Sequence, residues 1–238
     1  MKLIRNLSLG VLLMWVVSAC FTAPTYPVAP QIEYIDLYYG KSTDGGFDSI
    51  VVALKFNDGD GDIGLDDRYD SDPTFRLKDS FTFQNQPVTY KTKRLNPTLN
   101  GTNGKPLPNF VTPFSCTNWE VQRSNNVVTD TLYIELNPNY YNIFVDFYVD
   151  GVFFDPTTYF IYPNCSSAGY SGRIPVLSTD PGKKVPLDGK ITYAIKGLAL
   201  DALFSGKQLE LKITIQDRAL NKSNIITTGM FDLVTKRK

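Results

Sequence analysis

The sequence predicts an all-β protein built as an antiparallel β-sandwich with long irregular loops. Short runs of β-branched and aromatic residues alternate with polar residues, and turn-forming Gly, Pro, Asn and Asp separate these runs. The chain has 238 residues, of which 14 are Tyr and 15 are Phe. Because almost no amphipathic helices alternate with the strand-like runs, a sandwich is favoured over a parallel α/β sheet.

The predicted strands begin near the N-terminus and continue to the end of the chain. The first two, residues 32–39 and 48–56, are separated by the turn-forming residues 41–46 and are expected to form a hairpin. One short segment, 198–204, has apolar residues at helical spacing and stops before Gly206. The other predicted strands are 80–83, 88–92, 129–136, 143–149, 190–196, 208–216 and 225–234.

The N-terminal segment has the pattern of a lipoprotein signal peptide. Two basic residues precede an apolar run, 7–17, which is shorter than the ~20 residues of a permanent membrane-spanning helix. Residues 17–20, Val-Ser-Ala-Cys, resemble the lipobox that lipoprotein signal peptidase reads. The sequence therefore predicts a signal peptide at 1–19 and acylation of Cys20, with an ordinary secretory signal as the alternative.

The segment after Cys20 is expected to tether a soluble domain to the outer membrane. Residues 20–31 are Pro-rich and lack periodicity, and residues 32–238 are predicted to form a single β-sandwich domain. Phe21, rather than Asp, follows the Cys, which is typical of outer-membrane lipoproteins. Surface export in the Bacteroidota is associated with acidic residues at this place, so the periplasmic face is favoured over the cell surface.

The two remaining cysteines suggest a cross-link. If Cys20 is acylated, Cys116 and Cys165 are an even pair in an oxidising compartment, and a disulfide between them is expected. Two buried free thiols are the alternative. The pair lies at or within two long connections, 96–113 and 156–186, and loops of such length are usually functional or held by cross-links.

The composition excludes several classes of function. The chain contains no His, so Ser-His-Asp and Cys-His catalysis and His-ligated metal sites are ruled out. Its 24 basic residues balance 24 acidic residues without a basic block before the C-terminal end, so no nucleic-acid binding is indicated. Catalysis would have to depend on carboxylates, Tyr or Lys.

An acidic motif stands where the second strand should end. Asp58, Asp60 and Asp62 alternate with glycines, and a loop of this kind can bring carboxylates together around calcium in a structural role. An EF-hand is excluded, because Ile63 and Tyr69 occupy the positions that require Gly and Glu. The alternative is a tight turn in which the Asp side chains accept hydrogen bonds from nearby amides.

The C-terminal segment 213–228 is expected to form strand, turn and strand, with Asp217 hydrogen-bonded to the turn. It resembles the closing hairpin of bacterial immunoglobulin-like modules. Together with the motif at 58–65 and the segments 172–175 and 186–191, it makes the chain similar to a family of uncharacterised Bacteroidota outer-membrane lipoproteins. The resemblance implies an immunoglobulin-like sandwich and a lipid-anchored location, and no activity.

Aromatic residues are dense between residues 133 and 162. Phe153, Phe154, Tyr159 and Tyr162 are the candidate binding residues, because aromatics can stack on sugars or anchor a protein partner. In strands, however, such side chains more often form core and cross-strand pairs.

Three functions are consistent with these features. The favoured one is a non-enzymatic outer-membrane lipoprotein that acts as a subunit or accessory of a membrane protein complex. The second is a ligand- or glycan-binding lipoprotein with an aromatic surface. The third, a carboxylate-based hydrolase, has only the acidic residues 58–67 to support it.

Overall fold

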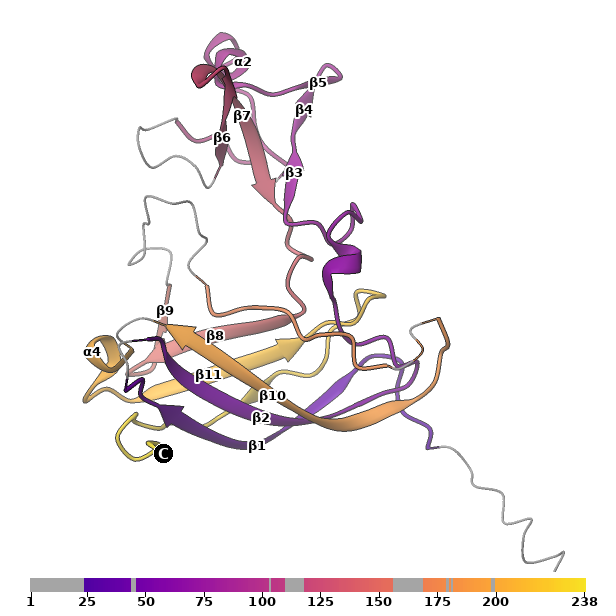
Figure 1. Ribbon diagram of the computed structural model, residues 1–238, viewed down its shortest axis with the longest axis vertical. Coiled ribbons are helices and arrows are strands. Elements are labelled where there is room, and N and C mark those ends of the chain that lie inside the picture. Colours follow the sequence, from indigo (N-terminus) through magenta and orange to yellow (C-terminus); the bar gives the residue numbers. More distant parts are fainter. Residues whose placement is uncertain are drawn as a thin grey trace, which may run out of the picture.

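Two antiparallel sheets face one another in the computed structural model, which describes residues 24–43, 46–102, 104–109, 118–155, 169–178, 180, 182–197 and 200–238 (Figure 1). The first sheet has the order β1-β2-β10, with β1 (Gln31–Gly40), β2 (Asp48–Asp58) and β10 (Leu187–Gly197). The second has the order β12-β11-β8-β9, with β8 (Ile143–Val149), β9 (Val152–Phe154), β11 (Leu209–Ile215) and β12 (Ile226–Thr227). The predicted all-β sandwich is confirmed.

One continuous hydrophobic core lies between the two sheets. In β11, Leu209, Leu211, Ile213 and Ile215 are fully buried, because alternate side chains of a strand point to the same face. They pack in the same cluster as Leu54 of β2 in the facing sheet. Strand alternation visible in the sequence therefore fixes which face of each sheet is internal.

A second, smaller core lies in the chain between β2 and β8. We call residues 78–136 the distal lobe. Its centre is the fully buried Trp119, whose ring centroid lies 5.1 Å from that of Tyr133 and 5.4 Å from that of Tyr90. The elements of the lobe are β3 (Lys78–Ser80), β4 (Thr82–Phe83), β5 (Gln86–Pro87), α2 (Tyr90–Leu95), β6 (Trp119–Ser124) and β7 (Val127–Leu136).

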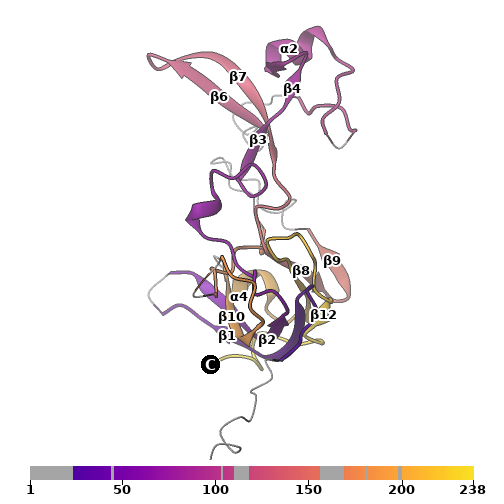
Figure 2. The same cartoon turned by 90° about the vertical axis from the view of Figure 1, so that its right-hand side faces the viewer.

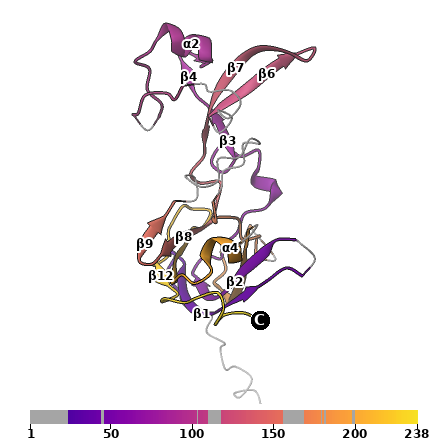
Figure 3. The same ribbon diagram turned by 90° about the vertical axis from the view of Figure 1, so that its left-hand side faces the viewer.

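The distal lobe and the N-terminal end of the described chain lie at opposite ends of the molecule. Figures 1, 2 and 3 show α2, β6 and β7 at one end and the segment beginning at residue 24 leaving the sandwich at the other. Among the described residues, no helix has the length and hydropathy needed to cross a membrane.

Two connections join the lobe to the sandwich, and Arg173 contacts both. Its guanidinium donates hydrogen bonds to the backbone oxygen of Phe75 in the first connection and of Tyr140 in the second, each at 2.8 Å. It also forms an ion pair with Asp70, just after the 3-10 helix η1 (Asp67–Tyr69), and lies 4.0 Å from the Tyr140 ring centroid. A single partly buried cation thus holds the two connections together.

Most predicted strands are present, with two differences. The predicted strand 88–92 is wrong: Thr89 caps α2 in a capping box with Thr92, and the residues from Tyr90 onward are helical. The predicted strand 225–234 is reduced to β12, after which the chain makes only isolated bridges. The helical segment expected at 198–204 is present as α4 (Leu200–Phe204).

Candidate metal centre

Four carboxylates form an acidic cluster where β2 and β11 end. One oxygen from each of Asp58, Asp60, Asp62 and Asp217 lies within 4.8 Å of the others. The first three belong to the predicted motif, which begins at Asp58, the last residue of β2, and the fourth comes from the hairpin after β11. The structure therefore brings the predicted motif residues together and adds Asp217, which the sequence indicated only as a turn former.

Glycine allows the loop after β2 to fold back on itself. Gly61 has a φ of +67°, and a Cβ atom there would collide with the backbone oxygen of Val185. The amide of Asp62 donates a 2.9 Å hydrogen bond to Oδ2 of Asp58, which closes the turn. This local geometry directs three carboxylates of a short segment toward one place.

The closing hairpin joins this loop through backbone and side-chain contacts. Ile63 forms an antiparallel bridge with Asp217, and the amide of Ala219 donates a 3.1 Å hydrogen bond to Oδ2 of Asp62. The expected turn contact is also present: both Asp217 oxygens accept hydrogen bonds from Asn221, at 2.7 Å from the backbone N and 2.9 Å from Nδ2. The position of Asp217 is therefore set by the strand ladder and by its own turn.

The cluster concentrates negative charge away from solvent. Asp58 and Asp217 are 0% and 2% exposed, and Asp60 is 6% exposed. Among the described residues, the Oδ1 atoms of Asp58, Asp60 and Asp62 are buried without a hydrogen-bond partner. Unpaired buried carboxylate oxygens are costly, so the arrangement favours a compensating positive charge.

Burial and mutual repulsion change the acidity of these groups. Desolvation, reinforced by the neighbouring carboxylates, raises the pKa of Asp58 to about 6 and that of Asp62 to about 6. Desolvation also raises the pKa of Asp217. Lys184 supplies one compensating charge, with its Nζ 3.2 Å from Oδ2 of Asp60, although its side chain is 83% exposed.

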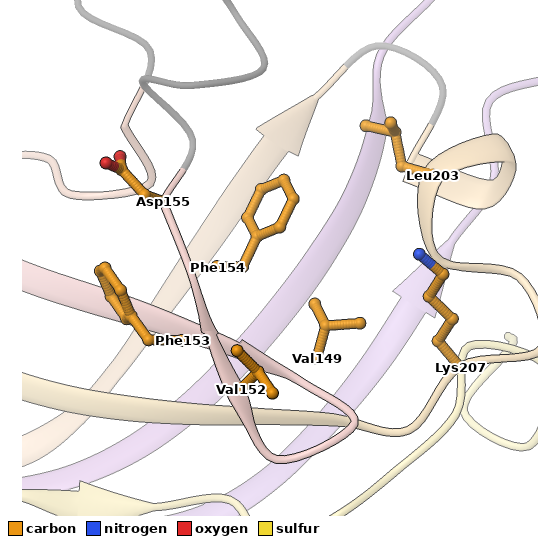
Figure 4. Close-up of a pocket in the computed structure, with 7 residues that line it drawn as sticks. All are labelled: Val149, Val152, Phe153, Phe154, Asp155, Leu203 and Lys207. Carbon is orange, nitrogen blue, oxygen red and sulfur yellow. The ribbon is translucent and has the colours of Figure 1, made fainter.

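The predicted aromatic surface is only partly described. Phe153 and Phe154 extend to opposite sides of β9, as Figure 4 shows. Phe153 is 52% exposed, whereas Phe154 packs edge-on against Phe204 with ring centroids 5.2 Å apart. Tyr159 and Tyr162 lie outside the described residues. The hollow at β9 measures about 390 Å³ and is lined by Val149, Val152, Phe153, Phe154, Asp155, Leu203 and Lys207.

Cys20, Cys116 and Cys165 also lie outside the described residues, so the lipidation and the disulfide stay predictions. No family model matches the chain, and neither the curated proteins nor the solved structures contain a significantly similar one. The fold and the acidic cluster are consequently the observations on which a function can be argued.

Proposed function

We propose that the protein is a non-enzymatic outer-membrane lipoprotein that acts as a subunit or accessory of an envelope protein complex. In this proposal Cys20 carries the lipid anchor, and the distal lobe contacts the partner protein. The supporting observation is the placement of that lobe. It has its own core, and it stands at the end of the molecule opposite the N-terminal segment (Figures 1 and 2). A membrane tether at residues 20–31 would then hold the sandwich near the bilayer and direct the lobe away from it.

The surface of the lobe has the character of a contact site. Leu95 at the end of α2 is 74% exposed, and Val127 and Val128 of β7 are 65% and 51% exposed. Between α2 and β7 lies a hollow of about 390 Å³ lined by Lys91, Arg94, Leu95, Thr129 and Asp130. Exposed apolar side chains bordered by charged groups are typical of protein interaction surfaces.

Affinity purification of the tagged protein from membranes in mild detergent, followed by quantitative mass spectrometry, tests the complex. We expect a stoichiometric membrane partner that is lost when Leu95→Asp and Val128→Asp are combined. Val234→Asp is the matched control, because Val234 is 68% exposed but lies outside the lobe. Recovery of no stoichiometric partner, or equal loss with the control, would contradict the proposal.

The anchor requires a separate test. Metabolic labelling with an alkyne fatty acid should mark the parent protein but not Cys20→Ala, which should move to the soluble envelope fraction. Location on the periplasmic face predicts that a protease added to intact cells leaves the protein uncut and cleaves it once the outer membrane is permeabilised. Cleavage in intact cells would place the protein on the surface instead.

A ligand-binding function is the second candidate, favoured by the exposure of Phe153 beside the hollow at β9 (Figure 4). An exposed ring next to a cavity can stack on the apolar face of a sugar. Calorimetric titration with envelope oligosaccharides should then give binding that Phe153→Ala abolishes. Ile225→Ala, a change at an exposed residue that does not line the hollow, should leave it unchanged.

A further inference from the structure

We propose that Asp58, Asp60, Asp62 and Asp217 together bind one calcium ion, which links the loop after β2 to the closing hairpin. This inference concerns the sandwich and is independent of the anchor and of the partner. It includes a ligand, Asp217, that comes from the other end of the sequence. For the three Asp residues near the end of β2, it also uses oxygens that have no hydrogen-bond partner among the described residues.

The first argument is the unpartnered oxygens. Each carboxylate of the β2 loop makes one hydrogen bond or ion pair through Oδ2: Asp58 with the amide of Asp62, Asp60 with Lys184, and Asp62 with the amide of Ala219. The Oδ1 atoms of these three Asp residues are buried and have no hydrogen-bond partner among the described residues. The loop thus positions each carboxylate through one oxygen and leaves the other for a ligand.

The second argument is size. Calcium binds oxygen at about 2.3–2.6 Å, so oxygens on opposite sides of the ion are about 4.6–5.2 Å apart. Four carboxylate oxygens that all lie within 4.8 Å of one another fit on a sphere of that diameter. Carboxylates can bind through one or both oxygens, so the set can provide much of the six- to eightfold coordination of calcium.

The third argument is ligand chemistry. The cluster consists entirely of carboxylates, which are hard donors, and the chain contains no His. Thiolate- and imidazole-preferring metals are therefore poor candidates. Magnesium requires nearly ideal octahedral geometry and retains several waters, whereas calcium accepts irregular sets of carboxylates. Calcium is the cation that this set fits best.

Positive side chains next to the cluster limit its affinity without occupying its centre. Within the cluster, Lys184 pairs with Oδ2 of Asp60, and its side chain is 83% exposed. Arg218 directs its Nη1 to the backbone oxygens of Ile63 and Gly64, at 3.4 and 3.1 Å. Neither side chain is hydrogen-bonded to the unpartnered Oδ1 atoms, so calcium would not have to displace a hydrogen-bonded cation from them.

Calorimetric titration of the chelator-treated full chain with calcium chloride tests this proposal. We expect one ion per chain and a rise in melting temperature on calcium addition. Asp58→Asn and Asp217→Asn should weaken binding by about tenfold or more, because even changes outside the ligand shell weaken metal sites about 10- to 100-fold. The matched control is Asp67→Asn, which removes the same charge from an exposed position outside the cluster.

Melting in chelator separates a lost ligand from a lost fold. Asp58→Asn should melt at or above the temperature of the parent when calcium is absent, because it removes a buried unpaired charge. It should also retain the β-sheet circular dichroism spectrum. Absence of calcium binding by the parent, or equal binding by Asp58→Asn and Asp67→Asn, would overturn the site. Unchanged binding by Asp217→Asn would overturn the four-residue ligand set, and an equal response to magnesium would overturn the assignment to calcium.

Discussion

In the presence of a chelator, raising the pH from about 4 to about 6 should destabilise the protein through Asp58. Desolvation and the charges of Asp62 and Asp60 raise the pKa of this carboxyl from 3.8 to about 6 in the folded chain. Between these values the folded state retains a proton that the unfolded state has lost, so the free energy of unfolding falls as the pH rises. Well below the lower pKa and well above the higher one, Asp58 does not make the free energy of unfolding change with pH.

The size of the effect follows from the shift. A change of about two pKa units corresponds to about 3 kcal/mol, which is an upper value for Asp58 alone. Asp62 has a similarly raised pKa, but neighbouring carboxyls titrate as a coupled group and their contributions do not add. Of the charged groups around them, Asp60 and Asp217 oppose the ionisation of both carboxyls, whereas Arg218 favours that of Asp62. Lys184 forms its ion pair with Asp60. A loss of about 3 kcal/mol would lower the melting temperature of a chain of this length by about 6–12 °C.

Thermal and urea unfolding followed by circular dichroism, at a series of pH values with chelator present, measures this slope. In Asp58→Asn the decline over the same pH interval should be much smaller. Asp67→Asn, at an exposed position, should behave like the parent. A stability that rises across the interval, or a decline of equal size in Asp58→Asn, would refute the account of a buried, repelled carboxyl.

Three further predictions concern the lobe, its connections and the acidic loop. Trp119→Ala should lower the free energy of unfolding of the distal lobe by about 3–5 kcal/mol. Amide hydrogen exchange should become faster in the lobe, while the amides of β2 and β11 stay protected. An equal rise in exchange in the sandwich would contradict a separate core. Arg173→Ala removes hydrogen bonds to both connections. Limited proteolysis should therefore cut at residues 66–77 or 137–142 faster than in the parent. Unchanged cleavage would contradict the role of Arg173 in holding the two connections together. In urea unfolding, Gly61→Ala should lower the free energy of unfolding more than Gly151→Ala does. Both glycines have a positive φ, but of the two only Gly61 faces a backbone atom. Equal losses would rule out the collision.

The strands of the sandwich were predictable because their signal is local. β8 was expected at 143–149 and lies at Ile143–Val149, since alternation and flanking turn residues are both contained in that segment. The segment 88–92 failed because its β-branched composition suggests a strand, whereas the pair of Thr89 and Thr92 side chains caps a helix. The distal lobe was not predicted, since its core joins Val88 and Trp119 through contacts between distant segments.

The acidic cluster was likewise predictable only where its residues are close together in the sequence. Asp58, Asp60 and Asp62 form a visible motif, but the fourth carboxylate is brought in by the bridge between Ile63 and Asp217 at the far end of the sequence. The complete cluster can therefore exist only after β11 and the loop after β2 have come together. A cation that needs all four carboxylates would bind the folded chain and not the unfolded one, so it would stabilise the closed sandwich by mass action. A peptide containing only the β2 loop should consequently bind calcium far more weakly than the intact protein does.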